Sequence, residues 1–484
     1  MNSDLLTVEP ETMLVGGNWI HSKDGQVLQS LNPATGQPVG SMARGRRSEV
    51  ALAVQAATAS QGAWADLDAT ARADYLYEIA RRIRAASERL ATVEALDAGI
   101  PIRNARTDIT AGANWLEYAA GLALETKGVT VPTSPQRFHY SIRQPYGVIA
   151  VLNPFNHPAM FALSKVAAPL AAGNTVVMKP PEQASLSTLE IAAIMQEVLP
   201  EGVVNVITGL GAEAGAALVA HKGVSKISFT GSLKTGRRIL VTASRRVTPV
   251  KLNAGGKGAN IVLPDCDLDL AVAGAVSGMS LGFCGQSCQS GTRLFLHESI
   301  RAVFVDKLVE RLEKVQIGMP VDPTTQMGPI VSKAQLDRVL GYIESGRQEG
   351  ATLVFGGDRP AEPKLSDGYF VRPTVFDGVT AKMKIGREEI FGPVLSIFSW
   401  RDQDKMLQQV NGLGYGLTAS VWTATLEAHR IARRIDAGYV YVNQHGGSYR
   451  GLPFGGWKQS GIGVEHTPEE LLEYSRPKSV AVLL

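Results

Sequence analysis

The chain has few cysteines and no long apolar run, and both shortages limit what it can be. Only three of its 484 residues are cysteine (Cys266, Cys284 and Cys288), too few for the disulfide framework of a small secreted protein. Its eight histidines show no metal-ligand spacing, so no metal is expected. No stretch approaches the roughly 18–20 apolar residues of a membrane span, and no signal peptide is apparent at the N-terminus. We therefore expect a reduced, cytoplasmic protein.

An excess of charge of one sign is also missing. The formal net charge is +3, which gives no support for a nucleic-acid partner or for an anionic membrane surface. Hydrophobic residues make up 45% of the chain and charged residues 19%, as is ordinary for a folded globular protein. A length of 484 residues exceeds what one hydrophobic core usually supports, so we expect two or three packed units.

Between residues 147 and 252, short runs rich in β-branched residues alternate with helical segments. The runs are 147–152, 175–178, 203–207, 226–229 and 250–252. The alternation predicts an α/β fold with a doubly wound parallel sheet, in which ligands bind at the carboxyl ends of the strands. Those ends carry Asn153, Pro154, Phe155, Asn156, Lys179, Glu182, Gly209, Gly231 and Ser232. We expect a nucleotide to bind there.

Other segments predict the rest of the architecture. Alternating helical and extended patterns from about residue 260 to 443 predict a second α/β unit, with one strand near residue 370. Ser48 is expected to cap a first helix, and a longer helix is expected over 69–96. The tail 478–484 is an apolar strand with no hairpin partner nearby, so it is expected to pair with a distant segment or another subunit.

The segment Gly285-Gln286-Ser287-Cys288 places a cysteine in a turn after a helix. An exposed thiolate there would be a strong nucleophile toward a carbonyl carbon. Taken alone, a single cysteine is more often a small buried apolar residue. Cys284 lies four residues earlier, but two thiols without a third ligand make a poor metal site.

Two further motifs suit a nucleotide. The segment 229–236 (FTGSLKTG) runs from a strand through a glycine turn into a helix, which points backbone N–H groups at an anion. Lys179 and Glu182 lie just beyond a strand end, where a Lys–Glu pair could hold ribose hydroxyls. Each feature alone is weak evidence, because glycine turns and solvated Lys–Glu pairs are common.

Taken together, six segments resemble the aldehyde dehydrogenase superfamily, in the order in which that family carries them. They are NPFNHP (153–158), VMKPPE (177–182), FTGSLKTG (229–236), GQSC (285–288), EEIFGPV (388–394) and PFGGWKQSGIG (453–463). The resemblance extends from about residue 14 to the end of the chain. It implies that Cys288 is the catalytic nucleophile.

The resemblance also implies roles for the other residues. Cys288 would attack an aldehyde, with the oxyanion held by the Asn156 amide and the Cys288 backbone N–H, and a thioester would follow hydride transfer. The cofactor-binding residues implied are Asn153, Pro154, Phe155, Lys179, Glu182, Gly209, Gly231, Ser232, Glu389 and Phe391. A carboxylate at position 182 would repel a 2′-phosphate, so NAD is expected in preference to NADP.

The chain departs from the family where the general base is expected. The usual Glu-Leu-Gly-Gly-Lys segment is replaced by Asn253-Ala254-Gly255-Gly256-Lys257, and an amide cannot accept a proton at neutral pH. Three interpretations remain open. Another carboxylate, Glu465 first and Glu389 second, could activate the water, or the thioester could pass to coenzyme A. Otherwise the protein binds an aldehyde or a nucleotide with little turnover.

The substrate is constrained only by the residues expected at the entry tunnel. These are His157, Phe161, Ser287, Gln289, Tyr449 and Phe454. The aromatic rings among them favour an apolar or aromatic aldehyde, although core packing would explain them equally well. Arg293 or Arg450 could instead bind the carboxylate of a semialdehyde.

The resemblance further implies a three-part subunit. An NAD-binding domain would comprise residues 1–122 and 146–253, and a catalytic domain residues 254–468. Segments 123–145 and 469–484 would form a small bridging β-sheet that joins subunits in a homodimer or homotetramer.

Overall fold

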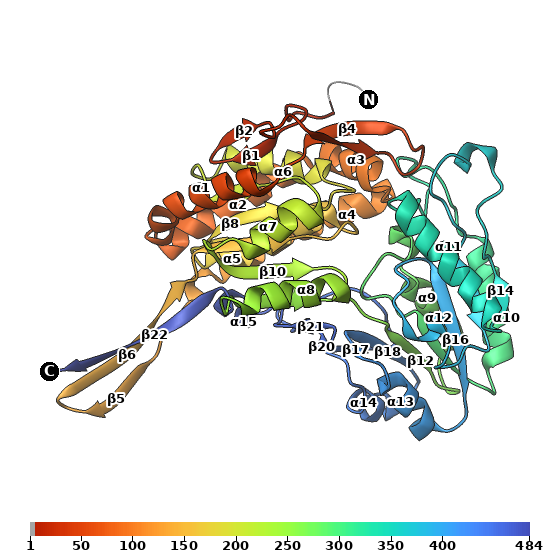
Figure 1. Cartoon of the computed structure of the whole chain (residues 1–484). Coiled ribbons are helices and arrows are strands. Elements are labelled where there is room, and N and C mark those ends of the chain that lie inside the picture. The colour runs from red at the N-terminus through yellow and green to blue at the C-terminus, as the bar shows by residue number, and fades with distance from the viewer. Residues whose placement is uncertain (1–4) are drawn as a thin grey trace.

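The computed structural model describes residues 5–484, and two α/β sheets dominate its architecture (Figure 1). The first sheet has eight strands. In spatial order they are β2 (Asn18–Ile20), β1 (Met13–Val15), β9 (Val204–Val206), β8 (Thr175–Lys179), β7 (Val148–Leu152), β10 (Val224–Thr230), β11 (Val250–Asn253) and β21 (Gly461–Ile462). The five strands predicted from the β-branched runs are all present and mutually parallel. The predicted doubly wound α/β class is therefore confirmed.

Helices cover both faces of this sheet because its strands are apolar on both sides. On β7, Ile149 and Val151 face one core, whereas Val148, Ala150 and Leu152 face the other. The helices of this part are α1 (Arg47–Ala65), α2 (Ala69–Ala85), α3 (Ser87–Ala98), α4 (Ile102–Gly121), α5 (Pro158–Ala171), α6 (Leu186–Gln196), α7 (Ala216–Ala220) and α8 (Leu233–Ser244), with the short turns η1 (Ala123–Glu125) and η2 (Gly211–Gly215). Helices α2 to α6 contribute to the first core, and α1, α7 and α8 to the second.

Strand register brings the predicted nucleotide-binding residues to one edge. Leu152 of β7 pairs with Lys179 of β8 and with Phe229 of β10, and Thr230 pairs with Asn253 of β11. The chain crosses between the two halves of the sheet at β7 and β10, so the strand order reverses there. Ligands bind beyond the carboxyl ends of strands at such a switch point.

The second sheet has seven strands and its own core. In spatial order they are β14 (Thr352–Phe355), β15 (Thr374–Asp377), β16 (Val394–Trp400), β13 (Arg293–His297), β12 (Ala259–Val262), β18 (Thr418–Trp422) and β19 (Tyr439–Val442). Its helical segments are α9 (Leu268–Gly278), η3 (Leu281–Phe283), α10 (Arg301–Glu313), α11 (Lys333–Gln348), η4 (Pro363–Leu365), α12 (Lys384–Arg387), α13 (Gln403–Asn411) and α14 (Glu427–Ala432). The second α/β unit expected from the sequence is therefore present.

A three-stranded sheet of β5 (Thr130–Ser134), β6 (Arg137–Pro145) and β22 (Ser475–Leu483) projects as an arm, with the C-terminus at its tip (Figure 1). The C-terminal strand pairs along its whole length with β6, so the predicted distant partner strand is confirmed. Apolar side chains on this arm are exposed, among them Val131, Phe138 and Leu483. The remaining elements are the pairs β3 (Val27–Leu31) with β4 (Pro38–Ala43) and β17 (Tyr415–Gly416) with β20 (Trp457–Lys458), and α15 (Pro468–Leu472).

Two local expectations were wrong. The single helix expected over 69–96 is two helices, α2 and α3, because the backbone leaves the helical conformation at Ala86, with a φ of −93° and a ψ of 6°. Helix α1 begins at Arg47 with Arg46 as its N-cap residue, so Ser48 does not cap it. The strand expected near residue 370 is present as β15, which begins at Thr374. Across residues 5–484, none of the helices combines the length and apolarity needed to cross a bilayer. The N-terminal residues 1–4, part of the segment expected to lack a signal peptide, lie outside the described residues.

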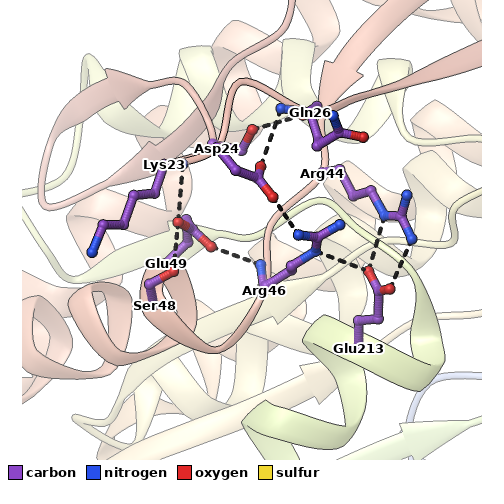
Figure 2. Close-up of polar contacts among 9 residues, drawn as sticks. Lys23, Asp24, Gln26, Arg44, Arg46, Ser48, Glu49 and Glu213 are labelled. Carbon is purple, nitrogen blue, oxygen red and sulfur yellow. Dashed lines mark hydrogen bonds and ion pairs between the residues drawn. The ribbon is translucent and has the colours of Figure 1, made fainter.

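An ion-pair cluster ties the N-terminal strands to the segment after β9 (Figure 2). The Arg44 guanidinium donates two hydrogen bonds, of 3.0 and 2.8 Å, to the Glu213 carboxylate. Arg46 Nε lies 3.5 Å from the Glu213 carboxylate, and the Arg46 guanidinium also pairs with Asp24. The backbone N–H of Arg46 donates to Glu49 at 2.7 Å, which closes the first turn of α1. Because Glu213 belongs to η2, the cluster anchors the segment that follows Gly209.

Helix α3 buries two carboxylic acids, Glu94 and Asp97, completely. Burial raises the pKa of Glu94 to about 8, a hydrogen bond from the Ala159 N–H opposes this shift, and the charge of Asp108 adds to it. Burial likewise raises the pKa of Asp97 to about 7 against a hydrogen bond from Ser30. Both groups therefore hold a proton more tightly in the folded chain than in the unfolded one.

These acids predict how stability depends on pH. From the ordinary pKa values of 4.5 and 3.8 up to about 8 and about 7, the folded state binds more protons than the unfolded state. The free energy of unfolding is therefore expected to fall as pH rises through this window. Glu94→Gln should reduce the slope, as measured by urea denaturation at about pH 5.5 and about pH 8. Glu201→Gln, at an exposed position, is the control, and an unchanged slope in Glu94→Gln would contradict the prediction.

Candidate active site

A cavity of about 580 Å³ lies between the two α/β parts of the chain. One wall consists of residues from α4 and α5, among them Asp108, Trp115, His157 and Phe161. The opposite wall contains η3 and the turn that leads to Cys288. Residues 445–448 and 465–467 line it as well, and Asn253 reaches it from the carboxyl end of β11. The cavity thus joins the predicted nucleophile to the nucleotide-binding edge of the first sheet.

Cys288 sits in a turn whose backbone depends on glycine. Gly285 has a φ of 70°, and a Cβ there would lie 2.2 Å from the carbonyl carbon of Gly392, so a larger residue would displace the chain. Cys288 packs against Leu417 and Phe454 among other apolar residues. Burial, together with the charges of Glu389 and Glu465, raises the pKa of its thiol to about 12. The cysteine is therefore a protonated thiol in this state.

The cavity is lined by His157, the N-cap residue of helix α5, and by Phe161 and Lys165 of the helix itself. Phe161 and Lys165 are four residues apart and so share one face of the helix. His157 Nδ1 lies 2.7 Å from Asp108 Oδ2 on α4, and its ring packs on Phe283 with the centroids 4.1 Å apart. Two turns further on, Lys165 pairs with the buried carboxylate of Glu465. The wall therefore carries two charge-assisted pairs separated by the Phe161 ring.

Of the two carboxylates proposed as substitute bases, Glu465 lines the cavity. Burial alone would raise the pKa of its carboxyl, but the ammonium groups of Lys165 and Lys251 hold it well below its usual range. Glu389 accepts a hydrogen bond from the Gly256 N–H at 3.0 Å, and burial raises its pKa to about 7. Gly255 has a φ of 80°, and a Cβ there would lie 2.4 Å from the Glu389 carboxylate.

Asn253 ends β11 and faces the cavity, and its Oδ1 atom is buried without a hydrogen-bond partner among the described residues. An amide here offers hydrogen bonds but no base. Asn156 is buried directly before His157, just beyond the end of β7. Ser287 and Gln289 flank the thiol and also line the cavity.

The nucleotide edge has the features that a dinucleotide requires. Lys179 Nζ donates to Glu182 at 2.7 Å, and burial lowers the lysine pKa while Glu182 opposes that shift. Both side-chain atoms of Asn153 are buried without partners among residues 5–484, which leaves them available to a ligand. A Cβ at Gly231 would lie 2.5 Å from the Phe229 ring, so only glycine fits this turn. These residues fit the expected nucleotide.

The remaining predicted cofactor residues come from the carboxyl ends of strands in the first sheet and from the second α/β part. Ser232 is the N-cap of α8 and accepts a hydrogen bond from the Thr235 N–H at 3.3 Å. Gly209 follows β9 with a φ of 137°. Phe155, after Pro154, and Phe391 come from the two different α/β parts, yet their rings meet edge to face with centroids 5.5 Å apart. The tertiary structure therefore brings together motifs that lie more than two hundred positions apart.

Three residues that the sequence suggested as substrate contacts are absent from the lining of the cavity. The Tyr449 side chain is 52% exposed and donates to Gln444 at 3.1 Å, because its loop turns the ring outward from the cavity. Arg293 is buried and donates to the backbone carbonyls of Lys257, Gln409 and Val410, so it meets no substrate. Arg450 is exposed and lies outside the cavity lining.

Several wall residues were missed by sequence reasoning. Asp108 and Trp115 belong to α4, which carries no motif, and only tertiary packing brings them to the cavity. His445 also lines it, and burial lowers the pKa of this histidine to about 4. Lys165 could have been found, since it lies four residues after the expected residue Phe161 on the same helical face.

Comparison with known proteins agrees with this geometry. The family model described as "Aldehyde dehydrogenase family" matches residues 19–480. An aldehyde dehydrogenase (tropH) of Talaromyces stipitatus is 41% identical over 97% of this chain and 92% of its own length. A hydroxyisobutyraldehyde dehydrogenase of Mycolicibacterium austroafricanum is also 41% identical, over 100% of this chain and 96% of its own. A Bacillus cereus aldehyde dehydrogenase solved as an NAD+ complex superimposes with a TM-score of 0.95 at 39% identity, covering 98% of this chain and 97% of that one. The resemblance inferred from the six motifs is therefore confirmed, and the chain belongs to the aldehyde dehydrogenase family.

Proposed function

We propose that the protein oxidises an aldehyde to its carboxylic acid with NAD, through a thioester on Cys288 that water hydrolyses. The observation that carries the proposal is the position of Cys288 on a cavity that also reaches Asn253 at the nucleotide edge. A nucleophile at the position of Cys288 can contact both a substrate that enters the cavity and a cofactor bound at the carboxyl ends of the strands.

Each residue of the proposed active site has a distinct role in the reaction. Once its proton has been removed, Cys288 Sγ attacks the aldehyde carbon and forms a thiohemiacetal. The Cys288 backbone N–H and the Asn156 amide donate hydrogen bonds to the developing oxyanion. The chemistry that NAD supplies when bound is acceptance of the hydride, which leaves a thioester on Cys288. Water then attacks the thioester, and the acid leaves.

Lys179 and Glu182 are the residues that would hold the adenosine ribose, because their charged groups lie at the end of β8 and accept and donate hydrogen bonds. Ser232 and the N-terminus of α8 would receive the pyrophosphate. Glu389 and Phe391 would contact the nicotinamide half together with Asn153, Pro154 and Phe155. Gly209 and Gly231 keep the crevice open to the nucleotide.

The cavity favours an aldehyde with an apolar or aromatic body. Aromatic side chains contribute much of its lining, namely Trp115, Tyr118, Phe161, Phe283 and Phe454. Rings of this kind bind planar apolar groups by stacking and edge contacts. The polar groups His157, Ser287 and Gln289 near the thiol would orient the reacting end.

The test is an assay of NADH formation with a panel of aliphatic, aromatic and carboxylated aldehydes, with and without coenzyme A. Steady NADH release without coenzyme A is expected. Turnover that appears only when coenzyme A is added would replace hydrolysis by acyl transfer to that thiol. Nucleotide binding without turnover under either condition would show that the protein only binds its ligands. This is the interpretation that follows if Asn253 leaves the protein without a general base.

The choice of NAD over NADP should depend on Glu182. Replacing its carboxylate by an amide, Glu182→Gln, removes the charge that would repel a 2′-phosphate. The ratio of kcat/KM for NAD to that for NADP is expected to fall by roughly tenfold, which corresponds to about 1.4 kcal/mol. Glu201→Gln, an exposed glutamate after α6, is the matched control. A ratio that stays unchanged in Glu182→Gln would exclude this carboxylate as the discriminating group.

The oligomeric state, the domain division and the cellular location of the protein are also predictions. We propose a homodimer or homotetramer in which the arm of β5, β6 and β22 joins subunits, since its apolar side chains are exposed. The division into residues 1–122 with 146–253, 254–468, and 123–145 with 469–484 is proposed on the same basis. Strand β21 nevertheless pairs with β11 across that division. A cytoplasmic location is likewise proposed, from the reduced cysteines.

A further inference from the structure

Hydrolysis of the thioester needs a base, and the structure shows that the usual position cannot supply one. Asn253 reaches the cavity at the carboxyl end of β11 but has only an amide. A water molecule near neutral pH is a weak nucleophile toward a thioester unless a group accepts its proton as it attacks. The base must therefore come from another wall of the same cavity.

Neither carboxylate expected from the sequence suits this role. Glu465 forms a buried ion pair with Lys165, which stabilises its charged form and makes it a poor proton acceptor. Glu389 is turned toward the backbone of Gly256, its contact with that N–H is 3.0 Å, and it is absent from the cavity lining. Its proposed role in holding the nicotinamide half would occupy its oxygens.

The His157–Asp108 pair has the geometry that both carboxylates lack. The 2.7 Å contact joins His157 Nδ1 to a carboxylate oxygen, so the proton of the neutral imidazole is held on Nδ1 and the lone pair is on Nε2. His157 lines the cavity that contains Cys288, and its Nε2 has no hydrogen-bond partner among the described residues. Its ring is fixed between Phe283, at 4.1 Å, and Phe161, at 5.6 Å.

Glu94 of α3 and Lys165 of α5 are further ionisable groups near this pair. Glu94 of α3 accepts a hydrogen bond from the Ala159 N–H at 3.2 Å, and the Asp108 charge contributes to raising its pKa to about 8. Glu94 is therefore neutral at pH 7. Lys165, two helical turns along α5, has its charge paired with Glu465. Asp108 is then the carboxylate that faces the imidazole and orients it.

We infer that His157, oriented by Asp108, is the general base that activates the deacylating water in place of the carboxylate missing at position 253. The inference rests on the proposed function, because it assigns one step of that reaction. His157 acts on the reacting water and is a catalytic residue, whereas Asp108 acts through the imidazole and is a positioning residue.

The step balances without any further reactant. The water oxygen forms a bond to the thioester carbon while one of its protons moves to His157 Nε2. The tetrahedral intermediate then collapses, the carbon–sulfur bond breaks, and its electron pair returns to Cys288 Sγ. The proton on His157 passes to the thiolate, so a thioester and water yield a carboxylic acid and the free thiol.

The decisive variant is His157→Phe, which keeps a ring against Phe283 but removes the base. The steady rate of NADH release is expected to fall by roughly 10²–10⁴-fold, whereas the first turnover still releases about one equivalent of NADH per subunit. Intact-protein mass spectrometry should then show the acyl group retained on the chain. His157→Gln provides a second test of the same loss, and thermal unfolding checks that both variants fold.

A restored carboxylate should make the histidine dispensable. Asn253→Glu is expected to recover most of the rate lost in His157→Phe when the two changes are combined. For Asp108→Asn, the steady rate of NADH release should fall while the first turnover is retained, since the imidazole loses the carboxylate that orients it. A change in folding alone would reduce the first turnover as well. His429→Gln, at an exposed position on α14, is the control.

The outcomes separate this inference from the proposed function. No NADH from the unaltered protein with any aldehyde would reject the proposed function itself. Normal steady turnover in His157→Phe would overturn the inference and leave the function intact. Loss of the first turnover in folded His157→Phe would also overturn the inference. Accumulation of acyl-enzyme in Glu465→Gln but not in His157→Phe would overturn it as well.

Discussion

Replacing Cys288 by alanine is expected to abolish both the first turnover and steady NADH release. The covalent route divides a difficult oxidation into addition, hydride loss and hydrolysis, and each of these steps needs the sulfur. Without it, no group on the cavity wall holds the aldehyde carbon in place. We expect kcat/KM to fall on the order of 10⁴-fold or more.

The other cysteines provide matched controls for this loss. Cys266 precedes α9, is absent from the cavity lining, and is only partly buried. Cys266→Ala should therefore leave turnover unchanged, as measured by NADH fluorescence with the same aldehyde. Cys284 is a poor substitute nucleophile, because burial raises the pKa of its thiol far above neutrality. Residual burst chemistry in Cys288→Ala would show that another nucleophile forms the thioester.

Replacing Asn156 by alanine is the second large effect that we expect. Its amide is proposed to donate to the oxyanion that forms when Cys288 attacks, and one such donor contributes about 2.7–4 kcal/mol. The expected fall is roughly 10²–10³-fold in kcat with little change in KM, because the charge develops only in the transition state.

Asn156→Asp sharpens this prediction. The carboxylate has the same shape as the amide but donates no hydrogen bond and carries a negative charge, so its effect should be at least as large as that of alanine. The position is buried beside His157, hence thermal unfolding must accompany the kinetics. If kcat stayed the same and only KM rose, the amide would be a binding group with no part in stabilising the oxyanion.

Local sequence patterns predicted much of the first sheet because each pattern reports a local physical requirement. The β-branched runs at 147–152 and 175–178 became the neighbouring strands β7 and β8. The glycine at 231 was expected in a turn, and the Phe229 ring leaves room only for glycine. The broken helix at 69–96 was missed, because nothing between α2 and α3 interrupts the helical pattern.

Side-chain direction was less predictable than strand position. Tyr449 and Phe454 lie five residues apart on one segment, and both were expected at the substrate. Phe454 is buried beside Cys288, whereas Tyr449 is 52% exposed. Arg293 was a candidate for a substrate carboxylate and instead donates to three backbone carbonyls. Outside regular helices and strands no fixed period sets the direction of a side chain, so packing decides it.

The amino-acid sequence by itself identified the family, made Cys288 the predicted nucleophile and showed an amide, Asn253, where the family carries its base. Each of these depends on the identity of one residue within a short local motif. Only the tertiary structure placed the His157–Asp108 pair, inferred to compensate for the missing base, in the wall of the cavity that contains Cys288. Asp108 and His157 are 49 positions apart and meet because α4 packs on α5, and Lys165 weakens Glu465 as a base only because the fold places them together. Proton affinity depends on burial and neighbouring charge, which exist only once the chain has folded.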